Sequence, residues 1–114
     1  MYQSVGEYEK ARDHLEKSLV IQREIGDRGG EVSSYASLGN VYEAVGEYEK
    51  ARDHLEKSLV IRKEIEDRGG EASSYANLGN VYHSVGEYEK ARDHLEKSLV
   101  IQREIGDRGG EASS

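Results

Sequence analysis

The apolar residues of this chain recur at helical spacing, in blocks separated by glycine-containing segments. In residues 7–25 they fall three or four positions apart, or near multiples of these, at Tyr8, Ala11, Leu15, Leu19 and Ile25. This spacing places them on one face of an amphipathic helix. Similar patterns predict helices over residues 7–25, 31–45, 47–66, 71–85 and 87–105.

The whole pattern repeats every 40 residues. Shifting the chain by this period places Tyr35 on Tyr75 and residues 46–48 on residues 86–88. Such a period is typical of a solenoid, in which one unit cannot bury its apolar face alone. We therefore expect one all-α array of helical hairpins. The array comprises a partial repeat (residues 1–30), two full repeats (31–70 and 71–110) and the first turn of another (111–114). We call the first helix of each unit helix A. We therefore expect the array to be cut inside a helix A at both ends.

Glycines have two roles in this interpretation. The segment 26–30, Gly46 and Gly86 end helices, because glycine adopts the left-handed conformation that terminates them. Gly39 and Gly79 lie inside predicted helices, where glycine costs about 1 kcal/mol relative to alanine. We interpret them as points where a neighbouring helix approaches closely; the alternative is that they have no role.

The repeat resembles the tetratricopeptide repeat, in which a large aromatic residue, Leu-Gly, Tyr, Gly, an aromatic residue, Ala and a bulky residue recur at fixed offsets. The first full unit matches with Tyr35, Leu38, Gly39, Tyr42, Gly46, Tyr48, Ala51 and Leu55, and the second with Tyr75, Leu78, Gly79, Tyr82, Gly86, Tyr88, Ala91 and Leu95. The resemblance implies a right-handed superhelix. The 40-residue unit with its Leu-Gly-Asn sequence is most similar to the Leu-Gly-Asn (Pins/LGN) subfamily, whose members hold extended peptides along the groove formed by their A helices. The chain departs from the family pattern in lacking proline.

The resemblance also implies which residues contact a peptide. They are Ser33, Ala36, Asn40 and Glu43 of the first full unit and Ser73, Ala76, Asn77, Asn80 and His83 of the second. Asn40 and Asn80 are the strongest candidates, because a side-chain amide can both donate to and accept from a peptide backbone. The alternative is that each Asn ties its own helix to a neighbour. These positions contain no Lys or Arg, which argues against the carboxylate clamp of chaperone-binding relatives.

Composition excludes several other functions. The net charge is −7, with acids and bases interleaved along the helices, whereas nucleic-acid binding requires a clustered basic patch. The chain has no cysteine, which fits a reducing, cytoplasmic compartment. Its longest purely apolar run is residues 59–61 and their copies, far shorter than the roughly 20 residues of a membrane span. We expect a soluble protein.

The sequence offers no candidate for catalysis. His14, His54 and His94 recur once per unit, so they would lie about 10 Å apart in stacked repeats, too far to bind one metal ion. No nucleophile and base are placed together in a pocket. We expect neither enzymatic activity nor a cofactor.

Two functional hypotheses remain. In the first, the chain is a scaffold that binds a protein or peptide ligand. In the second, it is a self-assembling repeat unit, excised from a longer protein or engineered, whose cut ends pair between molecules, with a dimer favoured over an open stack. The self-association residues would be Tyr8, Ala11 and Leu15 at one end and Leu99, Ile101 and Ile105 at the other.

Overall fold

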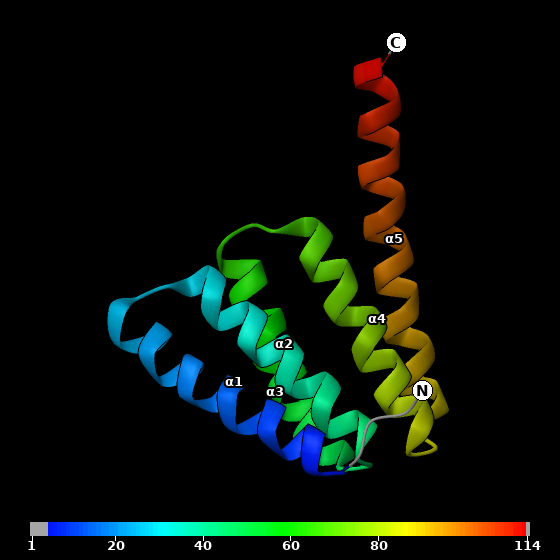
Figure 1. The fold of residues 1–114 in the computed structure, drawn as a ribbon. Coiled ribbons are helices and arrows are strands. Elements are labelled where there is room, and N and C mark those ends of the chain that lie inside the picture. Colours follow the sequence, from blue (N-terminus) through cyan, green and yellow to red (C-terminus); the bar gives the residue numbers. More distant parts are fainter. Residues whose placement is uncertain (1–4, 114) are drawn as a thin grey trace.

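The computed structural model describes the backbone of residues 5–113 and the side chains of residues 6–106. The described chain is all α-helical. Its helices are α1 (Val5–Ile25), α2 (Arg28–Ala44), α3 (Tyr48–Glu64), α4 (Arg68–Ser84) and α5 (Tyr88–Ser113) (Figure 1). The expected all-α class is confirmed.

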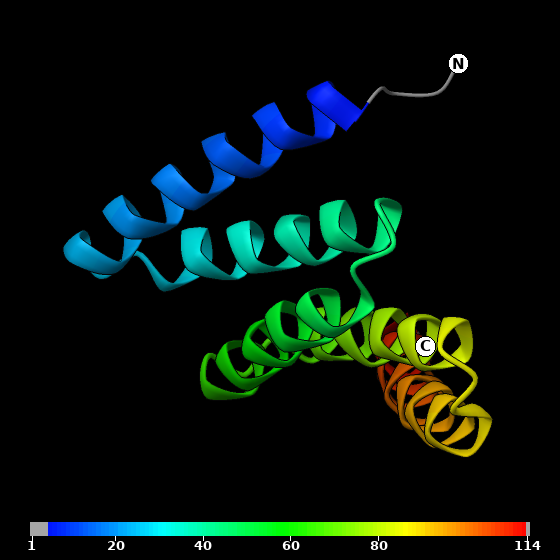
Figure 2. The ribbon, with the colours of Figure 1, turned by 90° about the horizontal axis from the view of Figure 1, so that it is seen from below.

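The helices pack as sequential hairpins, each against the next one along the chain. Seen from below, they follow one another in chain order, joined by short turns (Figure 2). In the terms of the repeat, α2 and α4 are the A helices, and α1, α3 and α5 are the second, or B, helices.

The core is built from aliphatic side chains and tyrosines. Leu38, Leu55 and Leu78 are fully enclosed between the helices. The bulky positions are filled by buried tyrosines: Tyr35, Tyr42, Tyr75 and Tyr82. Tyr42 and Tyr82 also donate hydrogen bonds to Glu16 and Glu56, over 3.0 and 3.2 Å. A tyrosine can therefore fill the core while its hydroxyl reaches a partner near the surface.

The A helices begin three residues earlier than the sequence pattern predicts. α2 starts at Arg28 because the carboxylate of Asp27 accepts a hydrogen bond from the backbone N–H of Gly30, 3.0 Å away, and Asp67 caps α4 in the same way. The two glycines that follow belong to the first helical turn. The chain therefore reverses direction within the few residues just before each capping aspartate. In these turns Gly26 has a φ of +73° and Glu66 a φ of +58°.

The predicted end of the last helix at residue 105 is wrong, since α5 continues to Ser113. Figure 1 shows it extending beyond the other helices. Residues 22–31 and 102–111 have the same sequence, yet the first forms a turn and the second a helix. The turn is held by the packing of α2 on α1. Within the described part of the chain, no helix follows α5 to pack back on it.

The interior glycines are points of close helix approach, as predicted. A β-carbon on Gly39 would lie 2.7 Å from Cγ of Leu55 on α3. Such a distance is far below van der Waals contact, so the glycine lets α2 and α3 pack together. The alternative, in which this glycine has no role, is wrong.

None of the described helices combines the length and the apolar composition needed to span a lipid bilayer.

Candidate peptide-binding face

Each A helix buries one side against the B helices and turns the opposite side outward. On α2 the buried side includes Val32, Tyr35, Leu38 and Tyr42. Residues three or four positions apart on a helix share a face, so the remaining positions form an outward stripe along each helix. The outward stripes consist of Ser33, Ala36, Ser37, Asn40, Glu43 and Ala44 on α2, and Ser73, Ala76, Asn77, Asn80, His83 and Ser84 on α4. All of these residues are exposed or half-buried, so every predicted peptide contact lies on the stripes.

Asn40 and Asn80 occupy the same position in the middle of the two stripes. Both are exposed. Among the described residues, neither side chain makes a hydrogen bond to the rest of the protein. The alternative in which each Asn ties its helix to a neighbour therefore has no support in this part of the chain. Their amide groups are available to an external partner.

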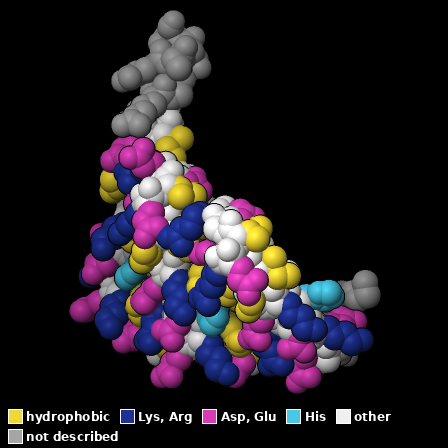
Figure 3. All heavy atoms as spheres, turned by 90° about the vertical axis from the view of Figure 1, so that its left-hand side faces the viewer, with side chains coloured by type: hydrophobic (Ala, Val, Ile, Leu, Met, Phe, Trp, Pro, Cys, Tyr) yellow, Lys and Arg dark blue, Asp and Glu magenta, His cyan; other side chains and the backbone are white. Residues whose placement is uncertain are grey.

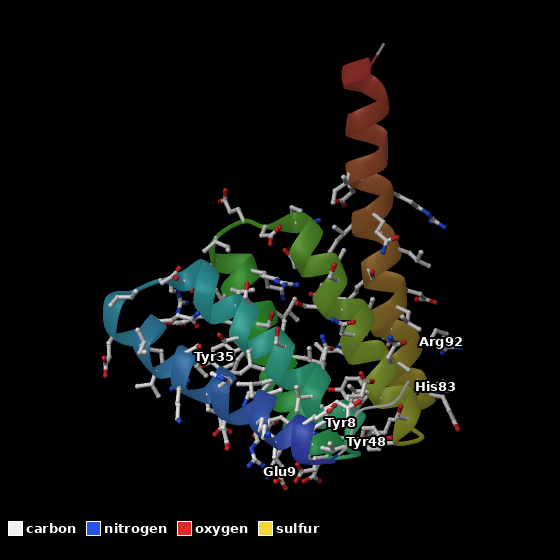
Figure 4. The ribbon with its side chains drawn as sticks, in the orientation of Figure 1. Tyr8, Glu9, Tyr35, Tyr48, His83 and Arg92 are labelled. Carbon is white, nitrogen blue, oxygen red and sulfur yellow. The ribbon has the colours of Figure 1, made fainter. Side chains whose placement is uncertain are left out.

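Glu43 differs from the other stripe residues because it carries a formal charge. Its side chain is half-buried, and burial raises the pKa of its carboxyl group. Within the described part of the chain, the carboxylate has neither an ion-pair nor a hydrogen-bond partner. The equivalent residue on α4 is His83, which is exposed and is labelled in Figure 4. Its ring lies edge-on to that of Tyr88, with centroids 5.1 Å apart.

Comparison with known proteins agrees with this geometry. A family model described as tetratricopeptide repeat matches residues 1–64 and residues 32–104. The chain belongs to the tetratricopeptide repeat family. Members of this family are generally protein-interaction modules built on a repeated helical hairpin.

Two solved structures share the tetratricopeptide fold of this chain. BtubC (BKLC) from P. vanneervenii is 25% identical with a TM-score of 0.80, and the match covers 87% of this chain and 41% of that one. The apo form of RapI is 26% identical with a TM-score of 0.81, and the match covers 94% of this chain and 39% of RapI. This tetratricopeptide array therefore spans about two fifths of either protein. The comparison with curated proteins gives no match.

A large hollow on this tetratricopeptide array, which the sequence did not predict, lies between α1, α2 and α3. Its volume is 680 Å³ and its lining comprises Arg23, Arg28, Glu31, Tyr35, Asp53, Glu56, Lys57, Val60 and Ile61. Several of its polar groups already contact one another. Arg28 forms ion pairs with Glu31, over 2.9 Å, and with Glu64. Arg23 donates to the hydroxyl of Tyr35, and Lys57 lies over that ring, 5.6 Å from its centroid.

These internal pairs distinguish the hollow from the outward stripes. Figure 3 shows that basic and acidic side chains are also interspersed over one side of the molecule. A ligand in the hollow would compete with contacts that the protein already makes. A ligand on the stripes would meet the unpaired groups of Asn40, Asn80 and Glu43.

Two of the three recurring histidines of the tetratricopeptide units, His54 and His94, pack against tyrosine rings. The centroid of the His54 ring lies 6.0 Å from that of Tyr35 and 5.0 Å from that of Tyr42. The Nδ1–H of His54 donates a hydrogen bond to the backbone carbonyl of Lys50, over 2.7 Å. His94 makes the equivalent contacts on α4 and α5. In the described residues, no three His, Asp or Glu side chains are grouped closely enough to bind a metal ion.

The exposed apolar face at the C-terminal end of the array differs in part from the predicted one. Leu99 is 49% exposed, whereas its equivalent inside the array, Leu59, is 9% exposed. Leu95, which the sequence did not single out, shows the same contrast, with 38% exposure against 1% for Leu55. These two leucines therefore define the uncovered face of α5, which we call the open face.

Two other predicted members of this face are placed differently. The expectation that Ile101 is bare is wrong, because it is 4% exposed, the same as Ile61, and belongs to the core. Ile105 is exposed, but so is its equivalent Ile65 inside the array, at 45%. Its exposure is therefore not a property of the end of the array.

At the N-terminal end, the predicted residues Tyr8, Ala11 and Leu15 are half-buried. Ile21, which the sequence did not identify, is 57% exposed where its equivalent Ile61 is 4% exposed.

Proposed function

We propose that this chain binds an extended segment of another protein along the outward stripes of α2 and α4. Membership of the tetratricopeptide family supports a protein-interaction role in general. The observation that carries the specific proposal is the pair of exposed asparagines, Asn40 and Asn80, in equivalent positions and without hydrogen-bond partners in the described structure.

The chemistry of the stripes suits recognition of a peptide backbone. Each Asn side chain can donate to a peptide carbonyl and accept from a peptide N–H. The residues beside them are small, such as Ala36, Ser37 and Ala76, so an extended backbone can approach the helices closely. Contacts of this kind depend little on the ligand's side chains, and we expect modest affinity. The role is non-enzymatic and uses no cofactor, in a reducing, cytoplasmic setting.

The test begins with a library of random 12-residue peptides displayed on phage and selected on the full chain. A selected peptide is synthesised and titrated by calorimetry. Asn40→Ala and Asn80→Ala should each weaken binding by about 1–2 kcal/mol, because a peptide amide loses its partner. Gln102→Ala, which removes an amide from α5 together with its hydrogen bond to Ser98, is the control away from the stripes and should bind as the parent does. Unchanged affinity in the Asn40→Ala/Asn80→Ala double variant would refute the proposal.

Self-association is a second candidate, favoured by the open face of α5. Leu95 and Leu99 are buried at the equivalent positions of α3 and exposed on α5, and uncovered apolar ends are a known liability of repeat arrays. A second copy of the chain would remove this surface from water, with a closed dimer favoured over an open stack. Sedimentation velocity at tens of micromolar tests this: a single species of 12.7 kDa would exclude it.

A further inference from the structure

Glu43 is placed where a carboxylate is unfavourable for the folded protein. It lies in the last turn of α2, which ends at Ala44. The aligned peptide dipoles of a helix place partial negative charge at its C-terminus, which disfavours a carboxylate there. Its side chain is half-buried, and a buried charge without a partner loses hydration without compensation.

Neighbouring residues do not offset this cost. Among the described residues, Glu43 makes no ion pair, whereas the buried Glu31 at the start of the same helix pairs with Arg28 over 2.9 Å. The outward stripes contain no Lys or Arg. Among the described residues, Glu43 is therefore a carboxylate of the outward stripes that no cation of the protein neutralises, and the negative end of the α2 dipole also favours a cation there.

We propose that the peptide held on the outward stripes carries a lysine or arginine side chain that pairs with Glu43. This inference rests on the proposed function and names the chemistry of its ligand. A basic side chain would supply the missing partner of Glu43 at the point where the protein has left it unpaired. The net charge of −7 works in the same direction, because it favours the approach of basic segments.

The test uses one peptide from the phage selection in three synthetic forms, with lysine, norleucine or glutamate at the position that contacts Glu43. Scanning lysine along the peptide identifies this position. The lysine form should bind the parent chain about three- to tenfold more tightly than the norleucine form, the range expected for a partly desolvated ion pair. The glutamate form should bind more weakly than either.

Two variants of the protein assign the effect to one residue. Glu43→Gln should bring the affinity for the lysine form down to that for the norleucine form, while the norleucine form binds as before. Glu43→Lys should reverse the order and favour the glutamate form. Glu89→Gln, on the exposed first turn of α5, removes the same charge elsewhere and should preserve the preference for lysine.

The outcomes separate this inference from the proposed function. Equal binding of the lysine and norleucine forms to the parent chain, or an equal loss of preference in Glu43→Gln and Glu89→Gln, would overturn the pairing with Glu43. The peptide-binding function would stand in either case if the asparagine variants still weaken binding. A lysine preference that depends on Glu43, in a peptide that requires Asn40 and Asn80, would establish both.

Discussion

Gly79 of α4 lies so close to Leu95 of α5 that a β-carbon on the glycine would be 2.8 Å from Cγ of the leucine. The contact repeats one unit earlier between Gly39 and Leu55, at 2.7 Å. The surroundings differ, however. Leu55 is 1% exposed and enclosed on all sides, whereas Leu95 is 38% exposed and has solvent beside it. The leucine is therefore held in place within the array and able to move aside on the open face, whereas the backbone carbonyl of Ala91, 3.2 Å from the β-carbon on Gly79, is fixed.

This difference predicts unequal effects of the same substitution. Alanine stabilises a helix interior by about 1 kcal/mol relative to glycine, while overpacking costs about 1–3 kcal/mol. Gly39→Ala should lower the free energy of unfolding by up to about 2 kcal/mol, because Leu55 cannot move aside. Gly79→Ala should stay within about 1 kcal/mol of the parent, because Leu95 can shift outward and only the carbonyl of Ala91, 3.2 Å from the new β-carbon, then remains close.

Urea denaturation followed by circular dichroism measures both variants. Gly79→Leu provides the larger test, with an expected loss of about 1–3 kcal/mol from overpacking. A Gly39→Ala protein that unfolds at higher urea than the parent would contradict the rigid contact.

The repeat itself was sufficient to predict the class, the number of described helices and most of the helical faces, although Ile25, predicted on the apolar face of α1, is 71% exposed. The apolar spacing depends on residues within one helix, such as Leu15 and Leu19, and can be read without knowing their neighbours. The outward stripes were predictable for the same reason, together with the family resemblance. The starts of the A helices were predicted too late because Asp27 was assigned to the turn. Its side chain accepts a hydrogen bond from the N–H of Gly30, so Asp27 is the N-cap of α2 and the helix begins at the next residue.

Features that depend on other parts of the molecule could not be predicted. Residues 22–31 and 102–111 are identical, so no local rule can assign a turn to one and a helix to the other. The exposure of apolar residues at the end of the array could not be predicted for the same reason. Ile101 and Leu99 are two positions apart on α5, but one belongs to the core and the other faces solvent. Only the positions of neighbouring helices separate these cases.

Glu66 provides a test of the turn geometry. Its φ of +58° is in the left-handed region, where side chains with a β-carbon are strained, and the equivalent Gly26 has a φ of +73°. Glu66→Gly should raise the free energy of unfolding by about 0.5–1 kcal/mol, because relief of strain outweighs the greater entropy of the unfolded chain. The reverse substitution, Gly26→Glu, should be destabilising. Equal stability of Glu66→Gly and the parent in thermal unfolding would show that the turn tolerates Glu.

The half-buried carboxylate of Glu43 predicts a pH-dependent stability. Burial raises its pKa in the folded state, so ionisation costs more in the folded than in the unfolded chain. The penalty is absent at low pH, where both states are protonated, develops as the pH rises through the unfolded pKa of about 4.3, and is complete above the folded pKa. Glu43→Gln should therefore be more stable than the parent at neutral pH.

The advantage of Glu43→Gln should vanish as the pH falls below about 4. Thermal unfolding of the two proteins across this range measures the difference, with Glu89→Gln as the control for loss of one acidic residue. A stability difference that is the same at neutral and acidic pH would mean that the effect of the Glu43→Gln substitution does not arise from ionisation.

The open face of α5 yields the last prediction, which concerns assembly. If a second copy covers Leu95 and Leu99, charged substitutions there should dissociate the complex, because a buried glutamate without a partner is costly. Leu95→Glu and Leu99→Glu should both sediment as monomers at concentrations where the parent is larger. Ile105→Glu is the control, since the equivalent Ile65 is equally exposed inside the array, and it should assemble as the parent does.

Ile21→Glu then distinguishes the geometries of the assembly. Dissociation would indicate that α1 of one copy packs on α5 of the next, as in a head-to-tail stack. Persistence of the dimer would indicate that two α5 faces are paired about a two-fold axis. Dissociation by Ile105→Glu but not by Leu99→Glu would place the interface elsewhere.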